Sequence, residues 1–99
     1  FSPFQKRRIQ TTGWSMQRQA RVIAINNQTG LIGLQPEGED SCVLVQQLDT
    51  RPVNTGQMLS GEMDSVGMET FVNAQTQDRI EVFVEAYGLS AEAVELALR

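Results

Sequence analysis

The 99-residue chain contains no histidine and only one cysteine. Without histidine, Ser-His-Asp and Cys-His catalysis, histidine general base chemistry and most zinc sites are excluded. The acidic residues are scattered singly through predicted turns and polar strand faces, where solvation is their ordinary role. Cys42 alone cannot form an intramolecular disulfide, so nothing indicates an oxidising compartment. We therefore expect no enzyme activity, no catalytic residues, no metal and no small-molecule cofactor.

Long apolar runs are also missing. No stretch approaches the roughly 18 residues of a membrane span, and residues 1–20 lack the apolar segment of a signal peptide. An apolar content of 40% is enough for one domain with a modest core. We expect a soluble, cytoplasmic protein with no membrane partner. Cys42 lies in a predicted strand with acids nearby, which predicts a buried and unreactive thiol.

Basic residues are scarce after the first fifth of the chain. The five that precede Glu37 are Lys6, Arg7, Arg8, Arg18 and Arg21. From Glu37 onward there are twelve acids and only three arginines, so the segments carry +5 and −9 and sum to −4. A basic arm on an acidic body can bind an anionic partner or pair with the body's own acids. The two interpretations imply different functions.

The rest of the chain alternates between apolar runs and turn residues. The runs predict five short strands, at residues 18–26, 31–35, 41–48, 57–65 and 69–75. Short strands at this spacing are typical of a small antiparallel barrel. We divide the chain into a basic N-terminal arm or leader at 1–15, a small β-barrel at 16–76 and a C-terminal segment at 77–99. The arm precedes Met16. It is therefore an upstream leader, part of a longer chain or an artificial extension, and the sequence does not decide between them.

Residues 79–87 fit two templates. The helical template is matched by Ile80, Phe83, Val84 and Tyr87, and strand alternation by Ile80, Val82, Val84 and Ala86. We favour a helix, because Thr76 or Asp78 can cap its start and Gly88 can close its end. The strand stays open as the alternative, since β-branched residues favour it.

Residues 90–99 predict a helix more clearly, because Ser90 is a good N-cap before an apolar face. The segment Gly88-Leu89-Ser90 resembles the turn of helix-turn-helix proteins. The second helix, however, presents Glu92 and Glu95, so packing on the barrel or another subunit is predicted over DNA contact. The expected fold class is mainly β: a small five-stranded antiparallel OB-like barrel with one or two C-terminal α-helices.

Residues 20–48 resemble the opening of a cold-shock domain, an OB-type barrel. Asn26, Thr29-Gly30 and Val43-Leu44-Val45 fall at places that correspond to that family's first strand, turn and third strand. Members bind single strands by stacking bases on exposed aromatics, worth about 1–3 kcal/mol per base. The matching positions here carry no aromatic ring, being Ala24, Leu31, Gly33, Leu44 and Gln46-Gln47. The resemblance implies the fold and argues against the family's stacking mode.

The leading hypothesis is a non-enzymatic binding module that contacts single-stranded RNA or DNA through the arm. The candidate contacts, with Phe1 and Phe4 interleaved, are Lys6, Arg7, Arg8, Trp14, Arg18 and Arg21. In the alternative interpretation, Arg18 and Arg21 pair with acids of the body and Trp14 covers the barrel end. The competing function is a protein-interaction or homodimerisation module, using the C-terminal helix or contacts between the arm and an acidic body.

Three methionines gather around the predicted fourth strand: Met58, Met63 and Met68. Methionine fills irregular gaps in cores, and when exposed it forms adaptable protein-binding surfaces. We expect these three to be buried.

Overall fold

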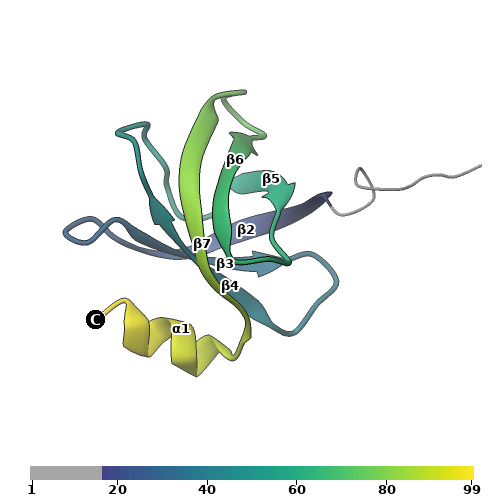
Figure 1. The fold of residues 1–99 in the computed structure, drawn as a ribbon, viewed down its shortest axis with the longest axis vertical. Coiled ribbons are helices and arrows are strands. Elements are labelled where there is room, and N and C mark those ends of the chain that lie inside the picture. Colours follow the sequence, from purple (N-terminus) through teal and green to yellow (C-terminus); the bar gives the residue numbers. More distant parts are fainter. Residues whose placement is uncertain (1–16) are drawn as a thin grey trace, which may run out of the picture.

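The computed structural model describes residues 17–99, which form a closed barrel of six antiparallel strands followed by one short helix (Figure 1). The elements are β2 (Gln17–Asn26), β3 (Leu31–Pro36), β4 (Cys42–Gln47), β5 (Met58–Glu62), β6 (Gly67–Asn73), β7 (Arg79–Leu89) and α1 (Ala91–Ala97). The fold class is confirmed as mainly β, with a small closed barrel that is compatible with an OB-like one. The barrel has six strands where the sequence predicted five.

The strand order around the barrel is β2-β3-β4-β7-β6-β5, and β5 closes the ring by pairing with β2. The first hairpin follows from local chemistry. The Asn26 side-chain oxygen accepts hydrogen bonds from the amides of Gln28 at 2.9 Å and Thr29 at 3.2 Å. Gly30 then takes a φ of +79°, a conformation that glycine adopts at little cost. The turn predicted at this position is confirmed.

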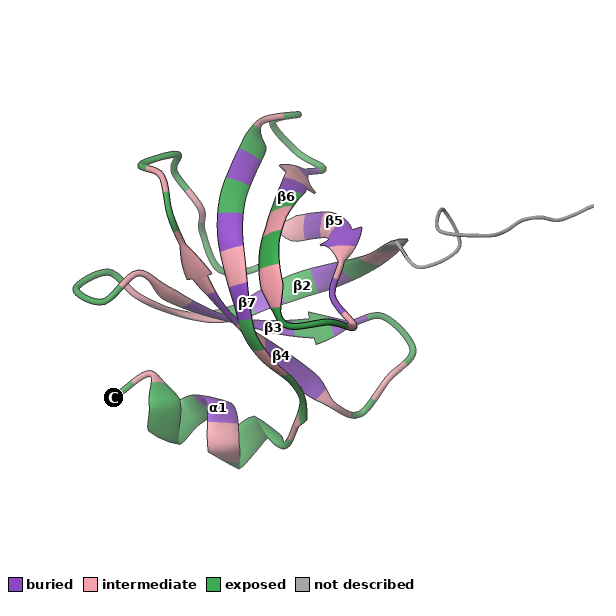
Figure 2. Ribbon diagram, viewed as in Figure 1, coloured by how far each residue is buried: buried purple, intermediate pink, exposed green. Residues whose placement is uncertain are grey.

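The sixth strand is the segment for which we favoured a helix, and that prediction was wrong. β7 lies between β4 and β6: residues 79–84 pair with β6, and residues 82–89 pair with β4. Ile80, Val82 and Val84 point into the core while the residues between them point outward, as the alternating bands in Figure 2 show. Most residues of β7 have a strand partner on at least one edge, and β-branched side chains prefer the strand. The barrel therefore continues past residue 76, where we had ended it.

The core fills the barrel interior. Its largest fully buried side chains are Phe71, Ile32, Leu34, Leu59 and Met63. One buried polar residue, Asn73, is satisfied within this core: its side-chain amide donates to Gln57 Oε1 at 2.9 Å, and its oxygen accepts from the Gln75 amide at 2.9 Å. The polar group is thus paired, as burial requires.

The helix α1 packs on the outside of the barrel. Ser90 caps it as predicted, since its Oγ accepts from the Ala93 amide at 3.1 Å. Val94 is 1% exposed and lies over Gly33 of β3, while Asn26 Nδ2 donates to the Leu98 carbonyl at 2.7 Å. A strand precedes α1, so residues 79–99 form no helix-turn-helix. In the described part of the chain, no helix has the length and apolar character needed to cross a membrane.

Candidate protein-interaction surface

The predicted nucleic-acid contacts are divided by the structure. Lys6, Arg7, Arg8 and Trp14 lie outside the described residues, and only Arg18 and Arg21 can be placed. The two described arginines differ sharply in their surroundings.

Arg18 is held by the barrel's own acids. Its Nε lies 2.9 Å from Asp64 Oδ2 in the turn after β5, and its Nη1 contacts Glu39 in the turn after β3. The guanidinium therefore ties two turns to the start of β2. This is the alternative interpretation for Arg18, and it leaves little of this charge for a phosphate.

Arg21 is exposed and forms no ion pair within residues 17–99. It stands on the outer face of β2, across from Gln35 on β3 and Met58 on β5. These three side chains line a hollow of about 190 Å³, with Glu37 and Glu39 on its rim. Two carboxylates beside one cation make the hollow a poor place for a phosphate. Over residues 17–99, five arginines against twelve acids give a net charge of −7.

The outer face that would carry stacking aromatics in a cold-shock domain is partly covered. A Cβ at Gly33 would lie 2.5 Å from Val94 Cγ1 and 3.3 Å from Leu98 Cδ1 of α1. Glycine at this position lets the helix lie directly on β3. The covering helix and the missing aromatic rings both disfavour base stacking on this face.

A different outer face carries exposed apolar side chains. We call it the β6–β7 strip, and it consists of the exposed Val66, Met68 and Tyr87 together with the half-buried Phe83. Met68 is 65% exposed and lies directly across the strand pair from Phe83. Val66, 58% exposed, comes just before β6, and Tyr87, 48% exposed, lies four residues farther along β7. Single exposed apolar residues are ordinary, whereas neighbouring ones form a patch.

Strand alternation explains why one methionine prediction held and another failed. Met63 is fully buried, which confirms the prediction for that residue, and Met58 is half-buried. Met68 is exposed, so its predicted burial was wrong. Phe71 and Asn73 of β6 point inward, and residues an odd number of positions away point outward. The sequence alone did not show which residues of β6 face the core, so it could not separate Met63 from Met68.

Acids flank the strip. Glu81 stands two residues before Phe83 and shares its outward face. Glu85 follows Phe83 by two residues, where the register of β7 with β4 shifts, and it is also exposed. Glu81 Oε2 accepts a hydrogen bond from Thr70 Oγ1 of β6 at 3.0 Å. The strip thus combines apolar contact area with negative charge along its length.

One edge of β7 is open beside the strip. The pairing of β6 with β7 stops at Gly67 opposite Val84, whereas β7 continues to Leu89. Beyond Val84, β7 pairs with β4, through Leu44 opposite Ala86 and Cys42 opposite Leu89. On its other side, residues 85–89 have no strand partner among the described residues, and this part of β7 projects past the start of β6 in Figure 1.

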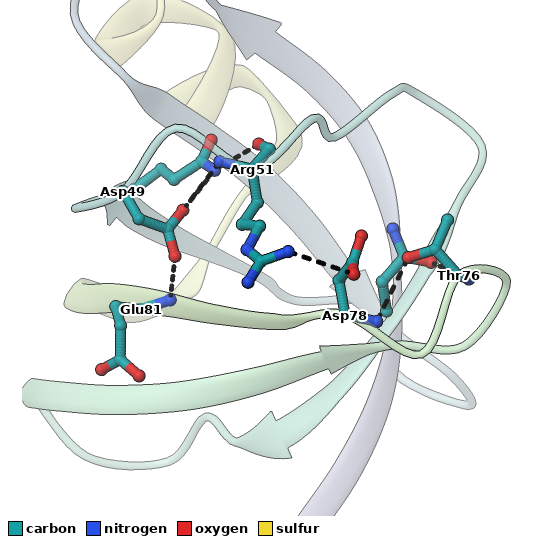
Figure 3. A network of polar contacts seen from close by, with 7 residues as sticks. Asp49, Arg51, Thr76, Asp78 and Glu81 are labelled. Atoms are coloured by element: carbon teal, nitrogen blue, oxygen red, sulfur yellow. Dashed lines mark hydrogen bonds and ion pairs between the residues drawn. The ribbon is translucent and has the colours of Figure 1, made fainter.

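A polar network holds the opposite part of β7 in place (Figure 3). Asp49, at the start of the loop after β4, accepts hydrogen bonds from the Glu81 amide at 2.9 Å, the Gln47 side chain at 2.8 Å and the Arg51 amide at 3.2 Å. Arg51 Nη1 also lies 3.4 Å from Asp78 Oδ1. Partial burial acts to raise the pKa of Asp49, but these hydrogen bonds and the Arg51 charge lower it overall. The network anchors a loop to β7.

Reactive groups are scarce in the described region. Cys42 is buried, and desolvation raises the pKa of its thiol, so the nucleophilic thiolate is disfavoured. Within residues 17–99, no group of three or more acidic or cysteine side chains is arranged to hold a metal ion. The exposed side chains of the β6–β7 strip make it a candidate binding surface of this region.

Comparisons of this chain with protein-family models, curated proteins and solved structures found no match.

Proposed function

We propose that this protein is a non-enzymatic module that binds another protein through the β6–β7 strip. The observation that carries the proposal is the exposed Met68 directly across from Phe83. Methionine and aromatic side chains are enriched in protein interfaces, and a contiguous exposed apolar patch is a candidate contact site. Full burial of one such side chain is worth about 1.5–3 kcal/mol, so a few of them can support measurable binding.

The flanking charges indicate the character of the partner. Glu81 and Glu85 are both exposed, and the surrounding body is acidic. A partner segment with basic residues beside its apolar ones would meet complementary charge, which raises the association rate and selects against acidic competitors. We infer an apolar, basic protein segment as the partner.

Contact with single-stranded nucleic acid remains a prediction from the sequence. It depends on Lys6, Arg7, Arg8 and Trp14, which lie outside the described residues, and on Arg21. The engagement of Arg18 by two acids and the helix over Gly33 favour the protein-binding proposal over it.

The two functions separate in one titration series followed by NMR amide shifts. The probes are a short peptide that alternates apolar and lysine residues, the same peptide with glutamate for lysine, and a single-stranded oligonucleotide. We expect saturable shifts around Met68 and Phe83 with the lysine peptide alone, weakening as salt rises. Equal responses to the two peptides, or none, would refute the proposal. A response to the oligonucleotide at Arg21, with the strip silent, would support nucleic-acid binding instead.

A further inference from the structure

We propose that the partner segment binds by strand addition, pairing antiparallel with the open edge of β7 at residues 85–89. The inference deepens the proposed function and rests on it, because it assigns a binding mode to the same surface. It comes from a separate observation: the pairing between β6 and β7 stops at Gly67, the first residue of β6, whereas β7 continues to Leu89.

The open edge has the size of one short strand. Residues 85–89 span at most roughly 17 Å at about 3.3 Å each. The strand is irregular here, because its register with β4 shifts on both sides of Ala86 and Gly88 takes a φ of +70°. A strand placed there continues the line of β6 and restores pairing on both sides of β7. Antiparallel addition is favoured, because it keeps the direction that β6 already has against β7.

The side chains of the edge define the sequence that fits. Glu85 and Tyr87 are both exposed and lie two residues apart. An added strand would place a basic residue opposite Glu85 and an apolar residue opposite Tyr87, since directly opposed side chains interact most strongly. In an antiparallel strand the residue opposite Tyr87 comes first. The preferred order is therefore an apolar residue before a basic one, with a spacing that the bulge of β7 near Glu85 adjusts.

The charges also argue against a second copy of this chain as the occupant. Pairing two β7 edges would bring together two copies of Glu81 and Glu85 on bodies that each carry −7 over residues 17–99. Charge on an exposed edge is a common device that suppresses association between like edges. A basic strand from a different protein is the better match.

Backbone methylation of the probe tests strand addition directly. The parent is the alternating apolar–lysine peptide, and two derivatives carry N-methyl groups on alternate residues, one derivative in each register. Only half of a strand's amides face its neighbour. We expect one derivative to bind at least about tenfold more weakly than the parent and the other to bind nearly as well. Hydrogen exchange at the amides of residues 85–89 should slow when the parent binds.

The possible outcomes distinguish a failure of the strand-addition proposal from a failure of the proposed function. If the parent binds at Met68 and Phe83 while both derivatives bind equally well, the strip stands and strand addition is refuted. If the parent does not bind at all, the proposed function fails and the inference falls with it. A dimer of the protein alone that protects the amides of residues 85–89 would overturn the assignment to a different protein.

A charge reversal supplies the second measurement. Glu85→Lys changes an exposed side chain, so the barrel should keep its fold. We expect it to weaken binding of the lysine peptide and to strengthen binding of the glutamate peptide, each by at least about threefold. Glu92→Lys on α1 is the matched control and should change neither affinity beyond the effect of net charge. Equal effects of the two substitutions would contradict a contact at Glu85.

Discussion

Replacing Gly33 with alanine should displace α1 from the barrel. A Cβ at this position would lie 2.5 Å from Val94 Cγ1, closer than carbon atoms approach without a shift. Val94 is β-branched and helical, so it has one strongly preferred rotamer and cannot easily turn aside. The helix must therefore move, and overpacking of this kind costs about 1–3 kcal/mol of unfolding free energy.

A substitution on the other side of this contact, Val94→Ala, provides a second free-energy change for comparison. Val94 is 1% exposed, and Val94→Ala removes two buried carbon atoms at about 0.8 kcal/mol each, with a further cavity term. We expect a loss of about 2 kcal/mol. In Gly33→Ala/Val94→Ala, the new methyl group fills part of the space that valine leaves. The double variant should then be more stable than the sum of the two single losses predicts, by at least about 1 kcal/mol.

Urea unfolding of the four proteins, followed by circular dichroism, measures this coupling energy. Amide hydrogen exchange in α1 provides a local readout, since the helix should exchange faster in Gly33→Ala while the barrel strands change less. Additive losses, within about 0.5 kcal/mol, would refute a direct contact between these two positions.

Other predictions follow from the polar network and the core. Asp49→Asn should lower the unfolding free energy at neutral pH, because the pKa of Asp49 is lowered in the folded state. Urea unfolding across a pH series measures the difference in stability between the variant and the wild type. This difference should disappear as the pH falls through the folded-state pKa of Asp49. Cys42 should react with a thiol reagent at least about 100-fold more slowly in the native protein than in denaturant, and rapid native labelling would contradict its burial. Asn73→Ala should cost about 1–3 kcal/mol in urea unfolding, because it removes a fully buried side chain whose oxygen accepts from the partly buried amide of Gln75. A neutral result would contradict a structural role for this side chain.

Features that depend on local chemistry were predictable from the sequence. The turn after β2 follows from Asn26 and Gly30, and the start of α1 follows from Ser90, because each cap or turn is made within a few residues. The barrel class followed from the spacing of these turns. None of these predictions required knowledge of which strands pair.

Residues 79–87 show where local evidence ends. Both periodicities fit the apolar positions, and the cap residues favoured the wrong one. Pairing with β4 and β6 decided the outcome, and those contacts come from segments distant in the sequence. The β-branched Ile80, Val82 and Val84 were the one local signal for the strand.

The candidate surface was the least predictable part. Met68 and Phe83 are fifteen positions apart, and only the register of β6 with β7 brings them together. The sequence raised an exposed methionine surface as a possibility but could not say which methionine would form it. Gly33 is similar: nothing in its sequence context indicated that its missing side chain makes room for α1.

The central claim is that the β6–β7 strip binds an apolar, basic protein segment. Calorimetric titration of the alternating apolar–lysine peptide tests it most directly, with Met68→Ser compared against Leu96→Ser. The two side chains are equally open, at 65% and 63% exposed, but Leu96 lies on α1. The account predicts that Met68→Ser weakens binding about tenfold or more while Leu96→Ser leaves it unchanged. Equal affinities for the two variants would contradict it.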